Sequence, residues 1–506
     1  MRIGIDVGGT NTDAALIGDT GNVLATVKSP TTADVTSGVA AAITSLGEPR
    51  ASAVMIGTTH FVNALVEASR LERVAAVRLG LPATAALPPM VDWPARLREV
   101  VGGRSYLCHG GHEYDGTPIS DLDPEELKRV AADIAGRGLR SVAISSVFSP
   151  VSAEFERRAA EILAAELGPD VHISLSSEIG RIGLLARENA TIVNAALRPL
   201  AVTTVGAFEE ALRVAGIDAP LFLSQNDGTL MDVGHARRYP VATFASGPTN
   251  SMRGAAYLSG LTECAVVDVG GTTSDVGILV GGFPREASGE AETAGVRTNF
   301  RIPDVLSLGI GGGSVISPDG TAGPRSVGYR LTSEALVFGG STLTATDLAV
   351  AAGYAEIGDP SLVSHLDPKD ALARIAERIA TTVDRMRTSA APLPVVAVGG
   401  GSILIPDELP GFDDVRRPGH FAVANAIGAA IAQVGGEVDR VFSGPRRKVL
   451  DEARAEAVAR AEKAGARGGS VRIVDVEEIP LAYLPGDALR VRVKAVGDLD
   501  LEKINA

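Results

Sequence analysis

The hydrophobic pattern of the chain opens with a short apolar segment that ends at a pair of glycines. Residues 1–7 carry mostly apolar side chains around Asp6, which predicts a short strand with a carboxylate near its end. Residues 8–13 read Gly-Gly-Thr-Asn-Thr-Asp, and further apolar segments follow at 14–17 and 22–28. Because glycine pairs allow a tight reversal of the backbone, the pattern predicts strands joined by glycine turns.

The same arrangement occurs again in the middle of the chain. Residues 264–269 form another apolar segment, with Asp268 near its end. Residues 270–275 read Gly-Gly-Thr-Thr-Ser-Asp, and the apolar segment 276–280 follows. Because both copies keep the same order and spacing, the sequence predicts two homologous halves, each opening with a glycine-turned hairpin.

Elsewhere, apolar strand patterns alternate with helical ones. Residues 141–148 have the continuous apolar pattern of a buried strand, and residues 153–167 have that of a helix. Residues 183–214 form a long, largely apolar helical segment, broken near Pro199, that suits the interface between the halves. Another apolar strand is expected at 394–398, before a run of three glycines. The alternation predicts an α/β fold.

These patterns divide the chain into three parts. We expect a first half at residues 1–190, with an insertion around 75–135, and a second half at 191–436. The composition then becomes charged, and residues 437–506 are expected to form a small C-terminal α/β module. The length agrees, because 506 residues at about 150 residues per domain correspond to roughly three domains.

Charge and cysteine content restrict the possible functions. The chain has 47 basic and 61 acidic residues and a net charge of −14, so we expect no nucleic-acid partner. It has no run of 18 apolar residues and no apolar signal segment at its start, so we expect no membrane association and a cytoplasmic location. Two cysteines are too few for a disulfide framework or a four-cysteine zinc site.

The paired glycines suggest phosphate binding. In a glycine turn no side chain covers the backbone N–H groups, and a phosphate fits the resulting concavity. Asp6 and Asp268 cannot bind phosphate directly, but they are expected to hold Mg²⁺ and its waters. A lone Gly-Gly-Thr is more simply a turn, whereas two copies with two aspartates favour a nucleotide site. The expected phosphate donors are Gly8, Gly9, Thr10, Thr12, Gly270, Gly271, Thr272 and Thr273.

A third glycine run follows the strand at 394–398. Gly399, Gly400 and Gly401, with Ser402, are expected to lie flat against a purine or ribose. Competing nucleotide motifs are missing, since the sequence contains no Gly-Lys dipeptide and therefore no Walker P-loop. The glycines at 309–314 imitate a dinucleotide fingerprint but are not followed by a helical pattern.

Other polar residues have two interpretations each. His60 precedes a phenylalanine and is more simply a packing residue than a member of the site. Cys108, His109 and His112 lie within five positions, so they form either a metal clip or a glycine-rich surface or substrate loop.

Several further segments, taken together, indicate a known family. In chain order, the segments are 6–13, 57–64, 178–179, 187–195, 227–230, 246–248, 268–275, 307–314, Asp347, 399–402 and 424–429. Over roughly residues 1–430 the chain resembles the A-type subunits of the hydantoinase/oxoprolinase family. That family lies within the superfamily of acetate kinases, sugar kinases, heat-shock chaperones and actin.

The resemblance implies an α/β fold of two duplicated actin-like (ribonuclease H-like) halves around a nucleotide cleft. It implies ATP and Mg²⁺ as cofactors and the ATP-dependent opening of a cyclic amide or imide, such as a hydantoin, oxoproline or a related lactam. Asp6, Asp268 and Asp275 become the catalytic candidates, the first two at the metal and the third handling a substrate proton. Gly311 and Gly312 join the expected nucleotide contacts.

The resemblance also bears on partners. A B-type half is not fused to this chain, so the expected partners are a small cyclic amide and either a separate subunit or further copies of the chain. Two other functions fit the glycine motifs: a small-molecule kinase of the same superfamily and a nucleotide-switched regulatory ATPase. The chain departs from the family pattern at Thr249, Asn250 and Ser251, where small residues and glycine are usual.

Overall fold

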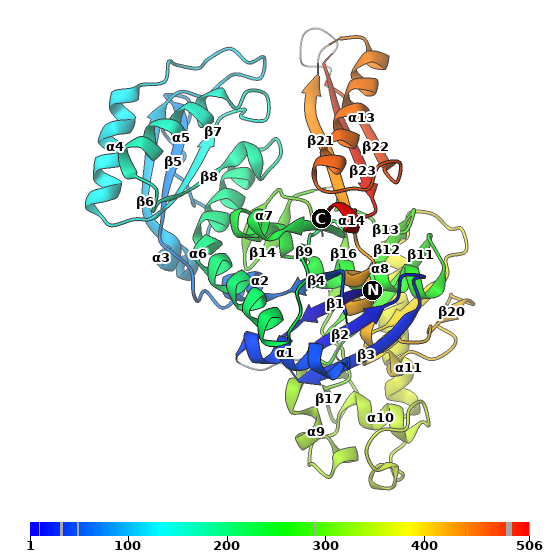
Figure 1. Ribbon diagram of the computed structural model, residues 1–506. Helices are drawn as coiled ribbons and strands as arrows, with labels where there is room; N and C mark the ends of the chain where they lie inside the picture. Colours follow the sequence, from blue (N-terminus) through cyan, green and yellow to red (C-terminus); the bar gives the residue numbers. More distant parts are fainter. Residues whose placement is uncertain are drawn as a thin grey trace.

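The computed structural model describes residues 1–9, 11–30, 34–47, 50–287, 289–442, 444–481 and 488–504. Figure 1 shows two neighbouring sheet regions in its lower part, with a lobe and a long hairpin projecting above them. The lobe is the insertion, and the hairpin is formed by the C-terminal residues.

The larger sheet has nine strands in the order β22-β23-β21-β10-β9-β4-β1-β2-β3. Its central strands are apolar and buried, as expected for strands covered on both faces. The strands are β1 (Arg2–Val7), β2 (Asn11–Ile17), β3 (Val23–Pro30), β4 (Ala53–Thr58), β9 (Leu221–Ser224), β10 (Thr229–Asp232), β21 (Gln433–Phe442), β22 (Arg472–Pro480) and β23 (Leu489–Gly497).

The second sheet has six strands, five of them in the order β13-β12-β11-β19-β20, with β16 paired to β12. Helix α11 (Lys369–Met386) buries an apolar face in the core of this half. The strands are β11 (Cys264–Val269), β12 (Ser274–Val280), β13 (Phe283–Pro284), β16 (Val305–Leu308), β19 (Val395–Val398) and β20 (Val415–Arg416).

The two sheets repeat one arrangement in the same register. β1 pairs with β2 so that Asp6 faces Asp13, and β11 pairs with β12 so that Asp268 faces Asp275. In both halves the first strand also pairs in parallel with a later one, β1 with β4 and β11 with β19. The predicted duplication and the predicted fold class are therefore confirmed.

The insertion is larger than predicted. It contains a parallel sheet in the order β6-β5-β7-β8, which extends to residue 175. Its strands are β5 (Val74–Leu81), β6 (Gly102–His109), β7 (Ser141–Ser146) and β8 (His172–Leu175), and its helices are α3 (Ala95–Val101), α4 (Pro124–Gly136) and α5 (Glu154–Leu167).

Strand pairing also changes the predicted boundaries. The expected boundary after residue 190 falls inside α6 (Leu184–Val214). β9 and β10, which we expected in the second half, belong to the first sheet. The C-terminal residues continue that sheet, because β21 pairs with β10, and α13 (Arg446–Lys463) covers this extension. Backbone hydrogen bonds between distant segments decide membership of a sheet, and composition along the chain does not show them.

Helix α6 runs through Pro199, where the sequence predicted a break. It contacts helix α1 (Val35–Ser45) of the first half and β7 of the insertion. Among the described residues, α6 is the one helix long and apolar enough to cross a membrane. However, 61% of its most apolar stretch of 18 residues is buried inside the protein. Its place between two structural units explains its apolar surface.

Further helices and two small hairpins complete the set of elements named here. The remaining helices and small hairpins are α2 (His60–Val66), α7 (Val233–Arg238), α8 (Ser246–Ser259), α9 (Leu331–Glu334), α10 (Ala345–Ala351), α12 (Ala424–Ala430), α14 (Leu501–Ile504), β14 (Ala291–Thr293) with β15 (Val296–Thr298), and β17 (Ser314–Ile316) with β18 (Ala322–Ser326). Helices α8 and α12 cross at glycines, since a Cβ on Gly254 or Gly428 would overlap the backbone of the other helix. This close crossing brings polar residues of both helices to the cleft.

Candidate functional site

A cavity of about 700 Å³ lies between the two sheets. Both glycine hairpins and the third glycine run contribute to its wall. The predicted residues that line it are Asp6, Gly8, Gly9, Asp268, Gly270, Gly271, Gly312, Gly399, Gly400 and Gly401. Residues from three distant segments thus converge on one space, as the nucleotide hypothesis requires.

Strand alternation corrects part of the prediction. Asn11 and Asp13 line the cavity, whereas Thr12 between them is buried on the other side of β2. Successive side chains of a strand point to opposite faces, so one hairpin strand cannot present all three. Thr10, also predicted, lies outside the described residues.

Five other predicted residues do not line this cavity. Gly311 packs tightly against the backbone of the second hairpin, and Ser402 is fully buried. Thr272 and Thr273 are exposed beside the cavity. Asp275 accepts a hydrogen bond of 2.5 Å from the Ser307 hydroxyl, on the neighbouring strand β16.

Asp6 is buried and Asp268 is half-buried. Burial, and then repulsion from Asp13, raise the pKa of Asp6 to about 7, although a hydrogen bond from Asn425 opposes the shift. Burial also raises the pKa of Asp268 to about 6, against a hydrogen bond with Ser251. Asp6 and Asp268 are close enough for the charge of Asp268 to add to the shift of Asp6.

Two residues that the sequence did not single out for the site complete its polar floor. The Asn425 Nδ2 atom donates to Asp6 Oδ2 at 2.9 Å and to Asp13 Oδ2 at 3.0 Å. The Lys28 ammonium lies 2.9 Å from both carboxylate oxygens of Asp13 and 3.3 Å from the Ala422 carbonyl. Lys28 is the one cationic side chain among the described residues that line this cavity.

One of the three residues that depart from the family pattern, 249–251, lies at the cavity. Ser251 lines the cavity and shares a hydrogen bond with Asp268. The neighbouring Asn250 is fully buried, and among the described residues neither of its amide atoms has a hydrogen-bond partner. A Cβ on Gly57 would meet both Asn250 Nδ2 and Asp6 Oδ1, so these two polar atoms face the same spot.

The third glycine run approaches Asp268 closely. Gly399 has a φ of +82°, and a Cβ on it would overlap the Asp268 carboxylate. The next residue, Gly400, has space for a Cβ, with Lys28 Cε as its nearest neighbour at 3.6 Å. Residue 399 must therefore be glycine, whereas local packing at residue 400 would allow a side chain.

The carboxylates suit a hard divalent cation. Asp6 Oδ1 is buried and has no hydrogen-bond partner among the described residues, which leaves a lone pair for an ion or its water. Oxygen ligands are those that Mg²⁺ prefers. Asp6 and Asp268 therefore fit the predicted metal role.

The cysteine and histidine segment does not form a clip. Cys108 is buried, and His112 packs against Phe155 at 4.4 Å between ring centroids. His109 points to Glu126. Within the described ranges, no group of three such ligands is assembled. His60 bonds Thr58 Oγ1 at 2.7 Å and lies edge-on to Phe208, in agreement with a packing role.

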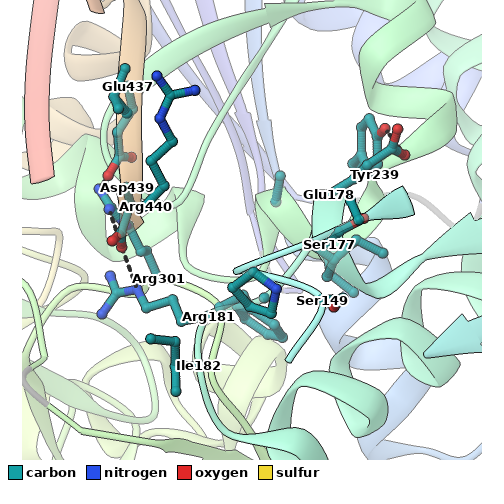
Figure 2. A pocket seen from close by; sticks show the side chains of 18 of the residues that line it. Ser149, Ser177, Glu178, Arg181, Ile182, Tyr239, Arg301, Glu437, Asp439 and Arg440 are labelled. Carbon is teal, nitrogen blue, oxygen red and sulfur yellow. Dashed lines mark hydrogen bonds and ion pairs between the residues drawn. The ribbon is translucent and has the colours of Figure 1, made fainter. Parts of the chain in front are cut away.

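A second cavity, of about 750 Å³, lies between the insertion, residues 225–242 and the C-terminal hairpin. Figure 2 shows Arg301, Glu437, Asp439 and Arg440 on one side, and Ser177, Glu178 and Tyr239 on the other. None of the described residues that line it also lines the first cavity.

Comparison with known proteins now identifies the family. Residues 2–167 match the "Hydantoinase/oxoprolinase N-terminal region", and residues 187–391 match "Hydantoinase/oxoprolinase". The chain belongs to the hydantoinase/oxoprolinase family. The second matched region begins in the first turn of α6, and residues 168–186 separate it from the first.

Proteins similar to this chain include two that are named as enzyme subunits. The caprolactamase subunit alpha of Pseudomonas jessenii is 28% identical over 85% of this chain, and the match spans 65% of that protein. The acetophenone carboxylase gamma subunit of Aromatoleum aromaticum is 28% identical over 47% of this chain, and the match spans 34% of it. The matches thus span less than two thirds of these relatives.

Two solved structures share the fold along nearly the whole chain. The ATP-dependent caprolactamase from Pseudomonas jessenii has a TM-score of 0.79 at 19% identity, over 99% of this chain and 88% of that one. A nucleotide-free acetone carboxylase, described for ATP-dependent acetone carboxylation, has a TM-score of 0.65 at 18% identity, also over 99% and 88%.

Proposed function

We propose that this chain is the ATP-binding subunit of an enzyme that phosphorylates and opens a cyclic amide or imide. The observation that carries the proposal is the pair of Asp-Val-Gly-Gly hairpins, which face one cavity in matching register. The ATP-dependent caprolactamase, similar along most of this chain, supports the choice of a cyclic amide.

The reaction begins with transfer of the γ-phosphoryl group of ATP to the carbonyl oxygen of the amide. The bond from the γ-phosphorus to the β–γ bridging oxygen breaks, a bond to the amide oxygen forms, and ADP leaves. An unactivated amide is a poor electrophile, whereas the phosphorylated imidate has a good leaving group and is open to attack by water. Catalysis of this kind depends on positioning and charge neutralisation.

The residues of the cavity divide these tasks. The backbone N–H groups of Gly9 and Gly271 would hold the phosphates, and the Lys28 ammonium would offset the phosphate charge. The N–H groups of Gly8 and Gly270 instead close the two turns, since they donate to the carbonyl oxygens of Asn11 and Thr273. Asp6 and Asp268 would hold Mg²⁺, which when bound neutralises phosphate charge. Asn425 holds Asp6 and Asp13 in one orientation through its two hydrogen bonds.

The test is positional isotope exchange, which does not require the second step. The purified chain is given Mg-ATP that carries ¹⁸O in the β–γ bridge, with and without caprolactam, hydantoin or oxoproline. Reversible phosphoryl transfer frees the β-phosphate of ADP to rotate, and the label then appears in non-bridging positions. We expect this exchange only when a cyclic amide is present.

The products separate the alternatives. An amidohydrolase yields ADP, inorganic phosphate and an opened ring, whereas a small-molecule kinase yields ADP and a phosphorylated product. A regulatory ATPase releases phosphate without changing any small molecule. The similarity to carboxylase subunits makes ketone carboxylation a second candidate, and incubation with acetone or acetophenone and bicarbonate tests it. Turnover of a ketone in place of every cyclic amide would overturn the proposal.

A further inference from the structure

The second cavity gathers segments that the nucleotide site leaves unused. Glu178, Ile179 and Asp227 belong to segments that carry the family resemblance, and all three line this cavity. None of them lines the nucleotide cavity. The volume, about 750 Å³, is within the usual range of small-molecule sites, about 300–1,000 Å³. These observations point to a second ligand.

One wall of the cavity offers guanidinium groups. Arg301 donates to Asp439 at 3.0 Å, and Arg181 donates to Glu286 at 3.3 Å. The Nε atom of Arg181 is buried and makes no hydrogen bond with any described residue, but it lies 3.8 Å from Asp439 Oδ2, within ion-pair distance. Because a guanidinium presents several planar N–H donors, Arg181 and Arg301 can also donate to a ligand carboxylate beside Asp439.

The opposite wall offers a carboxylate. Glu178 Oε2 accepts a hydrogen bond of 2.6 Å from the Tyr239 hydroxyl. No ion pair joins Glu178 to a cation within the described part of the chain, and its side chain is exposed to the cavity. Figure 2 shows Glu178 and Tyr239 across the cavity from Arg301. This wall can therefore accept hydrogen bonds from an ammonium group.

We propose that this cavity binds the ring-opened product, an ω-amino acid, with its carboxylate toward Arg181 and Arg301 and its ammonium toward Glu178. Hydrolytic opening of a cyclic amide breaks the C–N bond and places a hydroxyl on carbon and hydrogen on nitrogen. At neutral pH the product carries a carboxylate at one end and an ammonium at the other, and the two walls match those charges. The identity of the ligand rests on the proposed function.

The experiment measures binding without turnover. Isothermal titration of the full chain with 4-aminobutyrate, 5-aminopentanoate and 6-aminohexanoate is compared with titration by hexanoate and hexylamine. We expect saturable binding of at least one amino acid, and binding weaker by about tenfold for ligands that lack one charged end, because a charge-assisted hydrogen bond is then lost. Mg-ATP should not displace the amino acid, because the two cavities share no described lining residue.

Two variants locate the binding site. Glu178→Gln and Arg181→Met should each weaken amino-acid binding by about tenfold or more. Arg158→Met is the control, since Arg158 is exposed on α5 and does not line the cavity. If Arg181→Met does not fold, the exposed Glu178→Gln substitution decides.

The outcomes are distinguishable. Four results would each overturn this inference. The amino acids do not bind saturably, or both variants bind them as tightly as the wild type does. Alternatively, Mg-ATP displaces the amino acid, or hexanoate or hexylamine binds as tightly as the amino acid. The Mg-ATP affinity of the same samples tests the proposed function independently. Isotope exchange with a cyclic amide but no amino-acid binding would leave the proposed function intact and remove only the second site.

Discussion

Asn425 of α12 donates a hydrogen bond of 2.9 Å to Asp6 of β1, across 419 positions of the chain. The same amide nitrogen lies 3.0 Å from Asp13. One neutral side chain therefore holds two carboxylates whose charges repel each other, and it fixes the carboxylate that we assign to Mg²⁺.

Asn425→Ala is expected to lower turnover about tenfold or more, because each lost bond involves a charged acceptor, worth about 1.5–3 kcal/mol. The measurement is amide-dependent ADP release under saturating ATP. Asn22→Ala is the matched control, because Asn22 lies in an exposed turn and its side chain accepts from Thr20. Equal loss in both variants would remove the special role of Asn425.

Asp268→Asn is expected to reduce turnover by about a hundredfold, the order found when one charge-stabilising group is lost. Nucleotide affinity should change much less, because the backbone donor of Gly271 remains. Titration calorimetry and isotope exchange measure the two quantities separately. Abolished ATP binding with an unaltered rate would contradict the metal assignment.

Gly399→Ala is expected to weaken nucleotide binding and to lower stability. A non-glycine residue at positive φ costs about 1–2 kcal/mol, and the new Cβ would also overlap the Asp268 carboxylate. Gly400→Ala provides the control, since a Cβ there meets Lys28 Cε at 3.6 Å. Thermal unfolding and ATP titration should distinguish the neighbours, and equal tolerance would argue against a close approach at residue 399.

Lys494 and Asp227 form an ion pair of 2.9 Å in which Lys494 is 6% and Asp227 17% exposed. Burial alone would raise the pKa of Asp227, but the Lys494 ammonium and a Thr229 hydrogen bond lower it to about 2. Because the pKa of Asp227 is lower in the folded state than its ordinary value of 3.8, the ionised carboxylate stabilises the fold at pH values above about 3.8. This stability is lost as the pH falls toward about 2.

Lys494→Met should therefore lower the free energy of unfolding by about 3–5 kcal/mol at pH 7, because it leaves a buried charge unpaired. The difference from the wild type should shrink between about pH 4 and pH 2. Urea denaturation across this range measures both effects. Lys448→Met is the control, since Lys448 is exposed. A difference that is constant with pH would exclude the electrostatic explanation.

The isolated chain is expected to bind Mg-ATP but to open cyclic amides slowly or not at all without a partner. The described residues around the nucleotide cavity address phosphate and metal, and Asp275 is turned to Ser307. The relatives' names also describe subunits. The assay is ring opening by the purified chain, alone and with a co-expressed partner. Efficient turnover by the chain alone would place the water-activating base within this sequence.

Local sequence was sufficient for both hairpins. The apolar segments around Asp6 and Asp268 and the glycine pairs after them depend on short-range propensity, and both hairpins form as predicted. The resemblance to the family could also be found from these segments, because it rests on their order along the chain, which can be read without knowing the fold. Domain boundaries did not follow, since β9, β10 and β21 join the first sheet through hydrogen bonds to distant strands.

Tertiary structure decided what each copy of the hairpin can do. Asp13 and Asp275 hold equivalent positions in the sequence repeat, but the strand beside Asp13 brings Lys28 and the strand beside Asp275 brings Ser307. Only the first copy therefore has a cation in the cavity, among the described residues. The sequence determined where the carboxylates and glycines occur, because turns and strands are local. Ser251 and Asn425 entered the site only through the crossing of α8 and α12 and their packing on the two hairpins, which bring together residues far apart in the chain. Lys28 entered it through the pairing of β2 with β3.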